Sequence, residues 1–196
     1  MNNYTQSDVP SKRIELLRSF LGCRIISAIR YSWWPAEESA KECNILDKDV
    51  FSLTAGAVTL GFDSGLVLAI ANEPSAASVV IWLEKDAAGN ILRENSLEHD
   101  AELYPISADD FRFSDNFWRN IIGGEILTIS ILHRYPKNVL FSELPNEACL
   151  CFTLTSGIKF FATHGLHDDS DDFSVLEEKN IIPSIRKNLE EGTLIS

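Results

Sequence analysis

Apolar and polar residues alternate along two stretches of the chain that predict the same hairpin. In VTLGFDSGLVLAI (residues 58–70), apolar residues alternate with polar or small ones up to a tight turn at Gly65, and an apolar run follows the turn. The stretch LCFTLTSGIKFFA (residues 150–162) repeats this pattern with Gly157 at its turn. Glycine is expected at both turns, because a tight hairpin needs a residue that tolerates positive φ.

The similarity extends upstream of both hairpins. The stretch RSFLGCRII (residues 18–26) matches RNIIGGEIL (residues 119–127), and Gly22 aligns with Gly123. Each stretch follows a short helical pattern of apolar residues, and each glycine is expected to end its helix and precede a strand. In the second copy, Asp115 and the serine before it are candidates for the helix N-cap.

Each copy then continues through its hairpin to a further strand, at Ser78–Leu83 in the first and Phe173–Leu176 in the second. Few identities join the copies, so chance similarity is the alternative to duplication. A four-stranded sheet with one helix is too small to bury its apolar face alone. We therefore predict an α+β fold, mainly antiparallel β, in which two similar helix-plus-four-strand halves pack as a pseudo-two-fold pair.

The same pattern sets the expected organisation of the chain. Residues 1–85 form the first half, a helix plus a β-meander, and residues 114–196 form the second. Residues 86–113 are rich in charge and lack a strand pattern, which predicts a polar linker. A last helix is expected over Ser184–Glu191, after Pro183. The halves are expected to form one compact unit.

Composition is that of a chain with enough apolar material for a sizeable core, since 45% of its 196 residues are hydrophobic. No apolar run approaches the ~20 residues of a membrane helix, and the polar N-terminus lacks a signal-peptide pattern. We therefore expect a cytoplasmic protein with free thiols. Cys149 and Cys151 are two apart in a strand, so they share one face and are expected to be core or half-buried thiols.

The formal net charge of −12 disfavours nucleic acid as a partner and favours a basic protein. The alternative to a basic partner is that the acidic surface serves only solubility. The acidity is concentrated in the loop Thr163–Asp172, whereas the equivalent loop at residues 72–77 carries one acid. This asymmetry suggests that the four aspartates of the loop contact the basic partner; they are Asp168, Asp169, Asp171 and Asp172.

Other candidate sites compete with plainer interpretations. His164 and His167 of the same loop could ligate a metal, but the paired acids do not follow a calcium-loop spacing, which favours a solvated loop. Trp33 and Trp34 are candidate partner-binding anchors or, alternatively, cover a sheet edge. Arg18 and its equivalent, Arg119, are expected to bridge acids of the other half more than to clamp an anion. The chain lacks the GxSxG, GxGxxG, P-loop and HExxH motifs, so no enzymatic activity, metal or cofactor is expected.

The first hairpin, together with SVVIW (residues 78–82), resembles immunity proteins encoded beside toxins of polymorphic or contact-dependent growth inhibition systems. The resemblance implies a non-enzymatic, β-rich protein that binds a toxin domain and blocks its active site. Toxins of this group are often nucleases with basic clefts, which an acidic inhibitor would fit. The alternatives are a small-molecule-binding or enzymatic domain that uses the pocket between the halves, and a structural subunit of a larger assembly.

Overall fold

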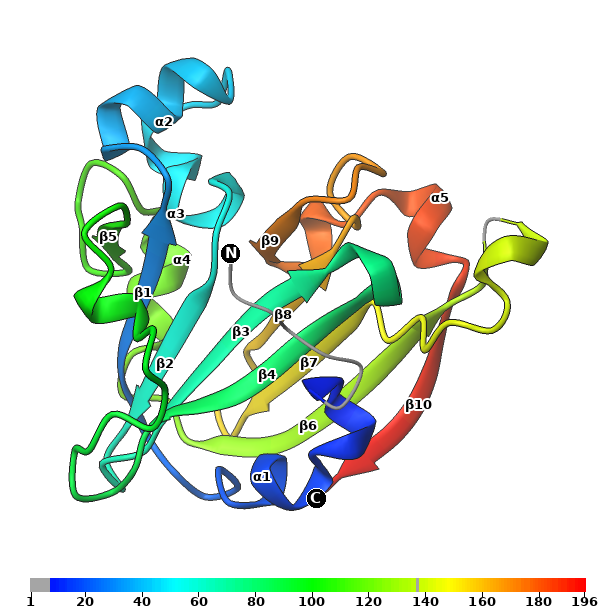
Figure 1. Cartoon of the computed structure of the whole chain (residues 1–196), viewed down its shortest axis with the longest axis horizontal. Helices are drawn as coiled ribbons and strands as arrows, with labels where there is room; N and C mark the ends of the chain where they lie inside the picture. The colour runs from blue at the N-terminus through cyan, green and yellow to red at the C-terminus, as the bar shows by residue number, and fades with distance from the viewer. Residues whose placement is uncertain (1–7, 137) are drawn as a thin grey trace.

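The strands form two five-stranded antiparallel sheets in the computed structural model, which describes residues 8–136 and 138–196 (Figure 1). In the first sheet the order is β4-β3-β2-β1-β5, formed by β1 (Ile25–Ser32), β2 (Val58–Phe62), β3 (Val67–Glu73), β4 (Ser78–Lys85) and β5 (Tyr104–Ser107). In the second it is β10-β6-β7-β8-β9, formed by β6 (Ile126–Arg134), β7 (Cys149–Leu154), β8 (Lys159–His164), β9 (Phe173–Leu176) and β10 (Leu189–Ile195). The predicted α+β class, mainly antiparallel β, is confirmed.

The helices are short and lie at the ends of strands. The α-helices are α1 (Ile14–Arg18), α2 (Ala36–Glu42), α3 (Val50–Leu53), α4 (Asn116–Ile121) and α5 (Pro183–Arg186). The 3₁₀-helices are η2 (Pro10–Lys12), η3 (Asp47–Asp49), η4 (Pro74–Ala76), η5 (Leu97–His99), η6 (Val139–Phe141) and η7 (Glu178–Asn180). Within the described residues, no helix has the length and apolar character needed to cross a lipid bilayer.

The two halves follow the same path, as the repeat predicted. Strands β1–β4 form a meander that β6–β9 repeat, and the fifth strand of each sheet pairs with the free edge of β1 or β6. The pairing register agrees as well, because Ala28 faces Leu60 in one sheet and Ile129 faces Phe152 in the other. Each first strand also carries a bulge one to two residues after its start.

The halves join at a corner where the two helix–strand junctions pair reciprocally. The Gly22 amide donates to the Ile126 carbonyl at 2.9 Å, and the Gly123 amide donates to the Ile25 carbonyl at 2.7 Å. Both glycines have positive φ, +74° and +85°, so each junction uses the left-handed conformation to turn from helix into strand. This exchange places the pseudo-two-fold axis between the junctions.

The inner faces of the two sheets share one hydrophobic core. Phe152 and Phe160 stack in its centre with ring centroids 4.8 Å apart, and Trp118 of α4 closes one end against Phe51 of α3. The Trp118 indole donates to the Ser52 hydroxyl at 2.7 Å, so this buried ring keeps a hydrogen bond. Each half therefore supplies the apolar surface that the other needs.

Two expectations about the connections were wrong. The 86–113 segment contains β5, and its Leu97 and Leu103 pack with Trp82 on the outer face of the first sheet. The helix expected over Ser184–Glu191 ends after one turn, and the chain continues as β10 along the edge of β6. In both places, pairing with a distant edge strand outweighs local sequence preference.

The outer face of the second sheet is covered by the segment around α5. Ile181 and Ile185 pack there with Cys149, Cys151 and Phe161. All four cysteines are free thiols, and Cys149 and Cys151 are buried on the same outer face of the sheet, as their spacing predicted.

Candidate functional site

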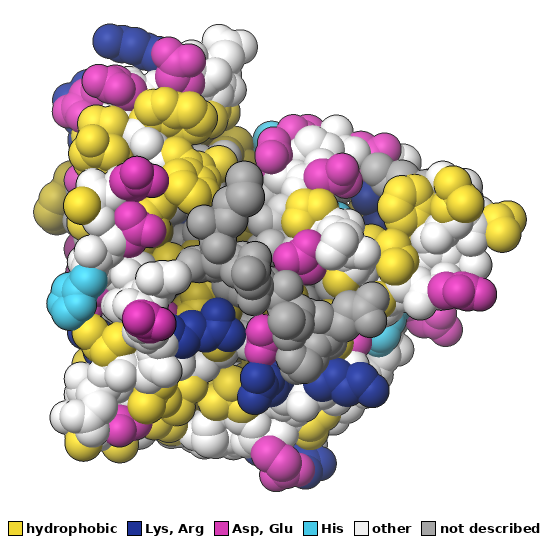
Figure 2. All heavy atoms as spheres, viewed as in Figure 1, with side chains coloured by type: hydrophobic (Ala, Val, Ile, Leu, Met, Phe, Trp, Pro, Cys, Tyr) yellow, Lys and Arg dark blue, Asp and Glu magenta, His cyan; other side chains and the backbone are white. Residues whose placement is uncertain are grey.

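A cleft of about 510 Å³ lies where α2 and α3 of the first half approach the start of β9 in the second. We call it the inter-half cleft. The surface is indented there, with hydrophobic side chains on the α2 side and acidic side chains opposite (Figure 2). Its lining is Trp34, Glu42, Cys43, Asn44, Ile45, Leu53 and Ala55 from the first half and His167, Asp168, Asp172, Phe173 and Ser174 from the second.

The four aspartates of the acidic loop do not act as one cluster. Asp168 and Asp172 line the inter-half cleft, whereas Asp169 forms an ion pair with Arg134 and Asp171 lies beside His164. Partial burial opposes ionisation of Asp168, but hydrogen bonds from Ser170 hold its pKa below the usual range. The cleft therefore carries an ionised carboxylate on this loop at neutral pH.

The opposite wall adds a third carboxylate and an aromatic ring. Glu42 ends α2, and Trp34 precedes that helix with 40% of its surface exposed. Trp33 is 52% exposed and is not among the residues that line the cleft. The lining holds three carboxylates without a lysine or arginine among its described residues, so its net charge is negative.

Arg30 lies fully buried beside this cleft. Its Nη2 donates to the carbonyls of Thr54 and Phe173, the latter at 2.6 Å, and its guanidinium carbon lies 4.5 Å from the centre of the Phe173 ring. Its Nε and Nη1 have no hydrogen-bond partner among the described residues. Burial lowers the pKa of Arg30 to about 9. The side chain thus ties the end of α3 to the start of β9.

The sequence analysis missed Arg30, although two signals point to it. Strand alternation places it on the same face as the core residue Ala28, and the repeat aligns it with Ile131, another core residue. Arginine at a position where the other copy has isoleucine marks a departure from the shared core.

Three buried hydroxyls support the same wall of the cleft. The hydroxyls of Ser32, Ser39 and Thr54 lie 2.6–3.0 Å from one another, and Ser32 also accepts the Trp34 amide at 3.2 Å. They connect the end of β1, α2 and the segment after α3, so the backbone of Trp34 is fixed from beneath.

The cleft offers poor conditions for nucleophilic chemistry. Burial, together with the charges of Asp172 and Glu42, raises the pKa of the Cys43 thiol, which keeps it protonated. His164 is buried outside the cleft, while His167 lines it. Within residues 8–136 and 138–196, no three His, Cys, Asp or Glu side chains group as metal ligands.

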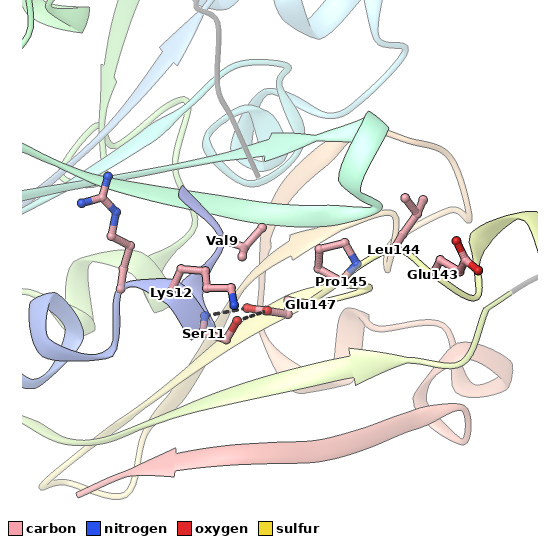
Figure 3. A pocket seen from close by; sticks show the side chains of 8 residues that line it. Val9, Ser11, Lys12, Glu143, Leu144, Pro145 and Glu147 are labelled. Carbon is pink, nitrogen blue, oxygen red and sulfur yellow. Dashed lines mark hydrogen bonds between the residues drawn. The ribbon is translucent and has the colours of Figure 1, made fainter. Parts of the chain in front are cut away.

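Two other openings differ from the inter-half cleft in charge or setting. A crevice of about 230 Å³ shares His167 and Leu53 with it, but the crevice's Lys48 and Lys179 pair with neighbouring acids. An opening of about 760 Å³ lies between η2 and the segment before β7, where Ser11 donates to Glu147 (Figure 3).

The structure thus brings three of the six predicted partner-binding residues, Trp34, Asp168 and Asp172, to one cleft. Arg18 and Arg119 lie apart from it, and each binds a neighbour on its own helix, Glu15 or Asn116. Comparisons with protein-family models, with curated proteins and with solved structures found no match.

Proposed function

We propose that this protein binds a basic protein domain in the inter-half cleft and inhibits it without catalysis, in the manner of a cytoplasmic immunity protein. The observation that supports the proposal is the convergence of Trp34 and Glu42 from one half with Asp168 and Asp172 from the other. These residues come from segments more than a hundred positions apart in the chain.

The chemistry of the cleft suits a cationic protein surface. Three carboxylates without a basic neighbour in the lining would speed encounter with a positive surface, and the net charge of −12 acts in the same direction. Trp34 adds a large, partly exposed ring whose backbone is held in place, which is the character of an interface anchor. In a nuclease toxin, the carboxylates would lie where substrate phosphates bind.

The second candidate is a small cationic ligand in the same cleft. Its volume of about 510 Å³ falls within the range of small-molecule pockets. The carboxylates would select a positive charge, so a polyamine is the natural probe.

The test purifies the domains encoded by the genes that flank this chain's gene as candidate toxins and measures their binding kinetics at about 50 and about 200 mM salt. The triple variant Glu42→Gln, Asp168→Asn, Asp172→Asn should slow association roughly tenfold at the lower salt and flatten its salt dependence. Trp34→Ala should act on dissociation, raising the rate by about thirtyfold if the ring is a hot spot.

The matched control removes three exposed acids that do not line the cleft, in the variant Glu94→Gln, Glu102→Gln, Glu190→Gln. It changes the net charge equally and should alter association far less than the cleft variant. Equal effects of the two triple variants would reject the cleft as the binding site. Absence of toxin binding together with saturable spermidine binding would favour the second candidate.

A further inference from the structure

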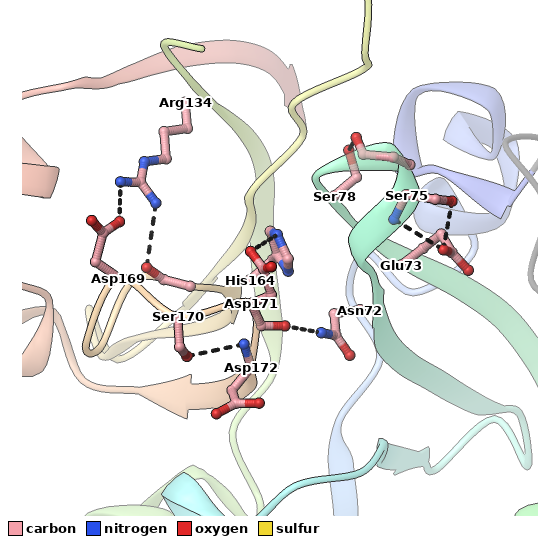
Figure 4. Close-up of polar contacts among 12 residues, drawn as sticks. Asn72, Glu73, Ser75, Ser78, Arg134, His164, Asp169, Ser170, Asp171 and Asp172 are labelled. Atoms are coloured by element: carbon pink, nitrogen blue, oxygen red, sulfur yellow. Dashed lines mark hydrogen bonds and ion pairs between the residues drawn. The ribbon is translucent and has the colours of Figure 1, made fainter. Parts of the chain in front are cut away.

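The acidic loop has a second side, which faces a separate socket of about 200 Å³ between the halves. We call it the Asp171 socket. Asp171 lies beside His164, whereas the carboxylate of Asp172 points away from both (Figure 4). The socket is lined by Pro74 and Ala77 from the first half and by Arg134, Tyr135, Phe141, Asn146, Ala148, His164 and Asp171 from the second.

Two aromatic side chains line the socket, and hydrogen bonds hold neighbouring parts of its wall in place. Tyr135 and Phe141 are 63% and 36% exposed, so both rings present accessible faces. The Asn146 amide donates to the Phe141 carbonyl at 2.7 Å, which fixes the segment that carries this ring. The Asn72 side-chain amide of the first half donates to the backbone carbonyl of Asp171 at 2.5 Å, which fixes the backbone at this residue.

The Asp171 carboxylate is the negative group that lines the socket. The Arg134 guanidinium is already engaged by Asp169 and by the Gly165 carbonyl. The Asp171 side chain is 78% exposed, and its ionic contact in the described residues is with His164 Nε2 at 3.9 Å, beyond hydrogen-bond distance. The carboxylate therefore keeps acceptor capacity for a donor that enters the socket.

An alkyl chain that ends in a cationic group matches this arrangement. Its methylene stem would pack against Tyr135 and Phe141, and its head would donate to Asp171. The rim fits a protein partner, because Val139 and Leu140 of η6, next to Phe141, are 85% and 86% exposed. Such apolar side chains around a polar contact exclude water from it at an interface.

We propose that the Asp171 socket binds one arginine or lysine side chain of the basic partner. This inference rests on the proposed function, and it extends the contact to both sides of the acidic loop. Asp168 and Asp172 would face the partner in the inter-half cleft, while Asp171 would hold a single side chain at the socket. A free basic amino acid carries the same cationic group, so the experiment must separate the two sources.

The experiment titrates the full-length protein with N-acetyl-arginine-N-methylamide and follows backbone amide NMR signals. We expect saturable shifts at Asn72, Tyr135 and His164, and no comparable shifts with the matching citrulline derivative, which lacks the charge. Asp171→Asn should weaken binding about tenfold or more, as loss of a hydrogen bond to a charged group does. Asp172→Asn makes the same charge change outside the socket and should weaken binding less than about twofold.

Equal shifts with the citrulline derivative, or equal losses in the two variants, would overturn the proposal. Tighter binding of free arginine than of the blocked derivative would also overturn it, because it would indicate a free metabolite. No toxin domain is used, so failure here leaves the inter-half cleft proposal standing. A protein that binds the blocked arginine in the socket but no toxin domain would reject the proposed function alone.

Discussion

Alanine at the two hairpin glycines tests how the 86–113 segment packs against the first half. Gly65 and Gly157 occupy equivalent turns with φ of +83° and +85°. Each amide closes its turn in the same way, through a bond of 2.9 Å from Gly65 to Phe62 and of 2.8 Å from Gly157 to Leu154. The backbone strain of an alanine should therefore be the same at both, about 1 kcal/mol.

The surroundings of the two glycines differ. A methyl group built on Gly65 would lie 2.8 Å from the carbonyl oxygen of Ala87, whereas nothing lies within 4 Å of one built on Gly157. Ala87 belongs to a turn closed by the Gly89 amide on the Asp86 carbonyl at 2.9 Å, so the backbone would have to shift. Such overpacking adds about 1–3 kcal/mol. We expect Gly157→Ala to cost about 1 kcal/mol and Gly65→Ala about 2–4 kcal/mol.

Urea denaturation followed by tryptophan fluorescence and by circular dichroism measures the free energy lost in each variant. In a separate thermal unfolding experiment, the midpoint should fall by about 3 °C for Gly157→Ala and by about 9 °C for Gly65→Ala. Asparagine tolerates the left-handed conformation, so Gly157→Asn should recover most of the loss while Gly65→Asn should not. Equal losses for the two alanine variants would refute the packing of the 86–89 turn on the first hairpin.

Four further predictions concern buried or capping groups. Arg30→Met should leave the free energy of unfolding within about 1 kcal/mol of wild type, because relief of the buried charge offsets its lost hydrogen bonds; a loss above about 3 kcal/mol in urea denaturation would show that the hydrogen bonds outweigh the cost of burying the charge. Burial raises the pKa of Cys149 well above its usual value and that of Cys151 to about 11, so both should react with a disulfide reagent at pH ~8 much more slowly than the partly buried Cys23. Because the pKa of Cys151 is higher in the folded state than in the unfolded state, its thiol should stabilise the fold fully below pH ~9, and the free energy of unfolding should fall as pH rises to ~11. Urea denaturation across this pH range should show the fall in wild type and a smaller one in Cys151→Ala. Asp115→Ala removes the cap on the Phe117 amide and should cost about 1 kcal/mol in the same assay.

The elements that depend on residues close together in the chain could be predicted. The hairpins follow from strand alternation and from one glycine per turn, and both were found where the pattern placed them. Asp115 accepts the Phe117 amide at 3.0 Å, as the predicted N-cap requires. These elements depend on neighbours within a few residues, so the sequence carries enough information to place them.

The fifth strands and most of the site depend on distant contacts. β5 and β10 are ordered along the edges of β1 and β6, and the β10 sequence gives no sign of this, since Glu190 and Glu191 face solvent. Trp34 and Asp168 are 134 positions apart, and only the packing of the halves brings them to one cleft. Arg134 and His164 determine which aspartates of the loop turn away from it.

The pseudo-symmetry explains where a binding site can arise in this fold. At the corner end, the reciprocal bonds of Gly22 and Gly123 join the two helix–strand junctions in equivalent conformations. At the opposite ends of the sheets, the connections are independent of one another. The first half carries α2 and α3 there, and the second carries the acidic loop.

Arg30 lies where the α2–α3 segment of the first half meets the end of the acidic loop in the second half. Its equivalent, Ile131, only fills the core, whereas Arg30 joins the segments that follow α3 and precede β9. Two identical halves would give two equal sheet ends with no preferred surface. The buried Arg30 side chain connects the segment after α3 in the first half to the start of β9 in the second, and the inter-half cleft lies beside this contact.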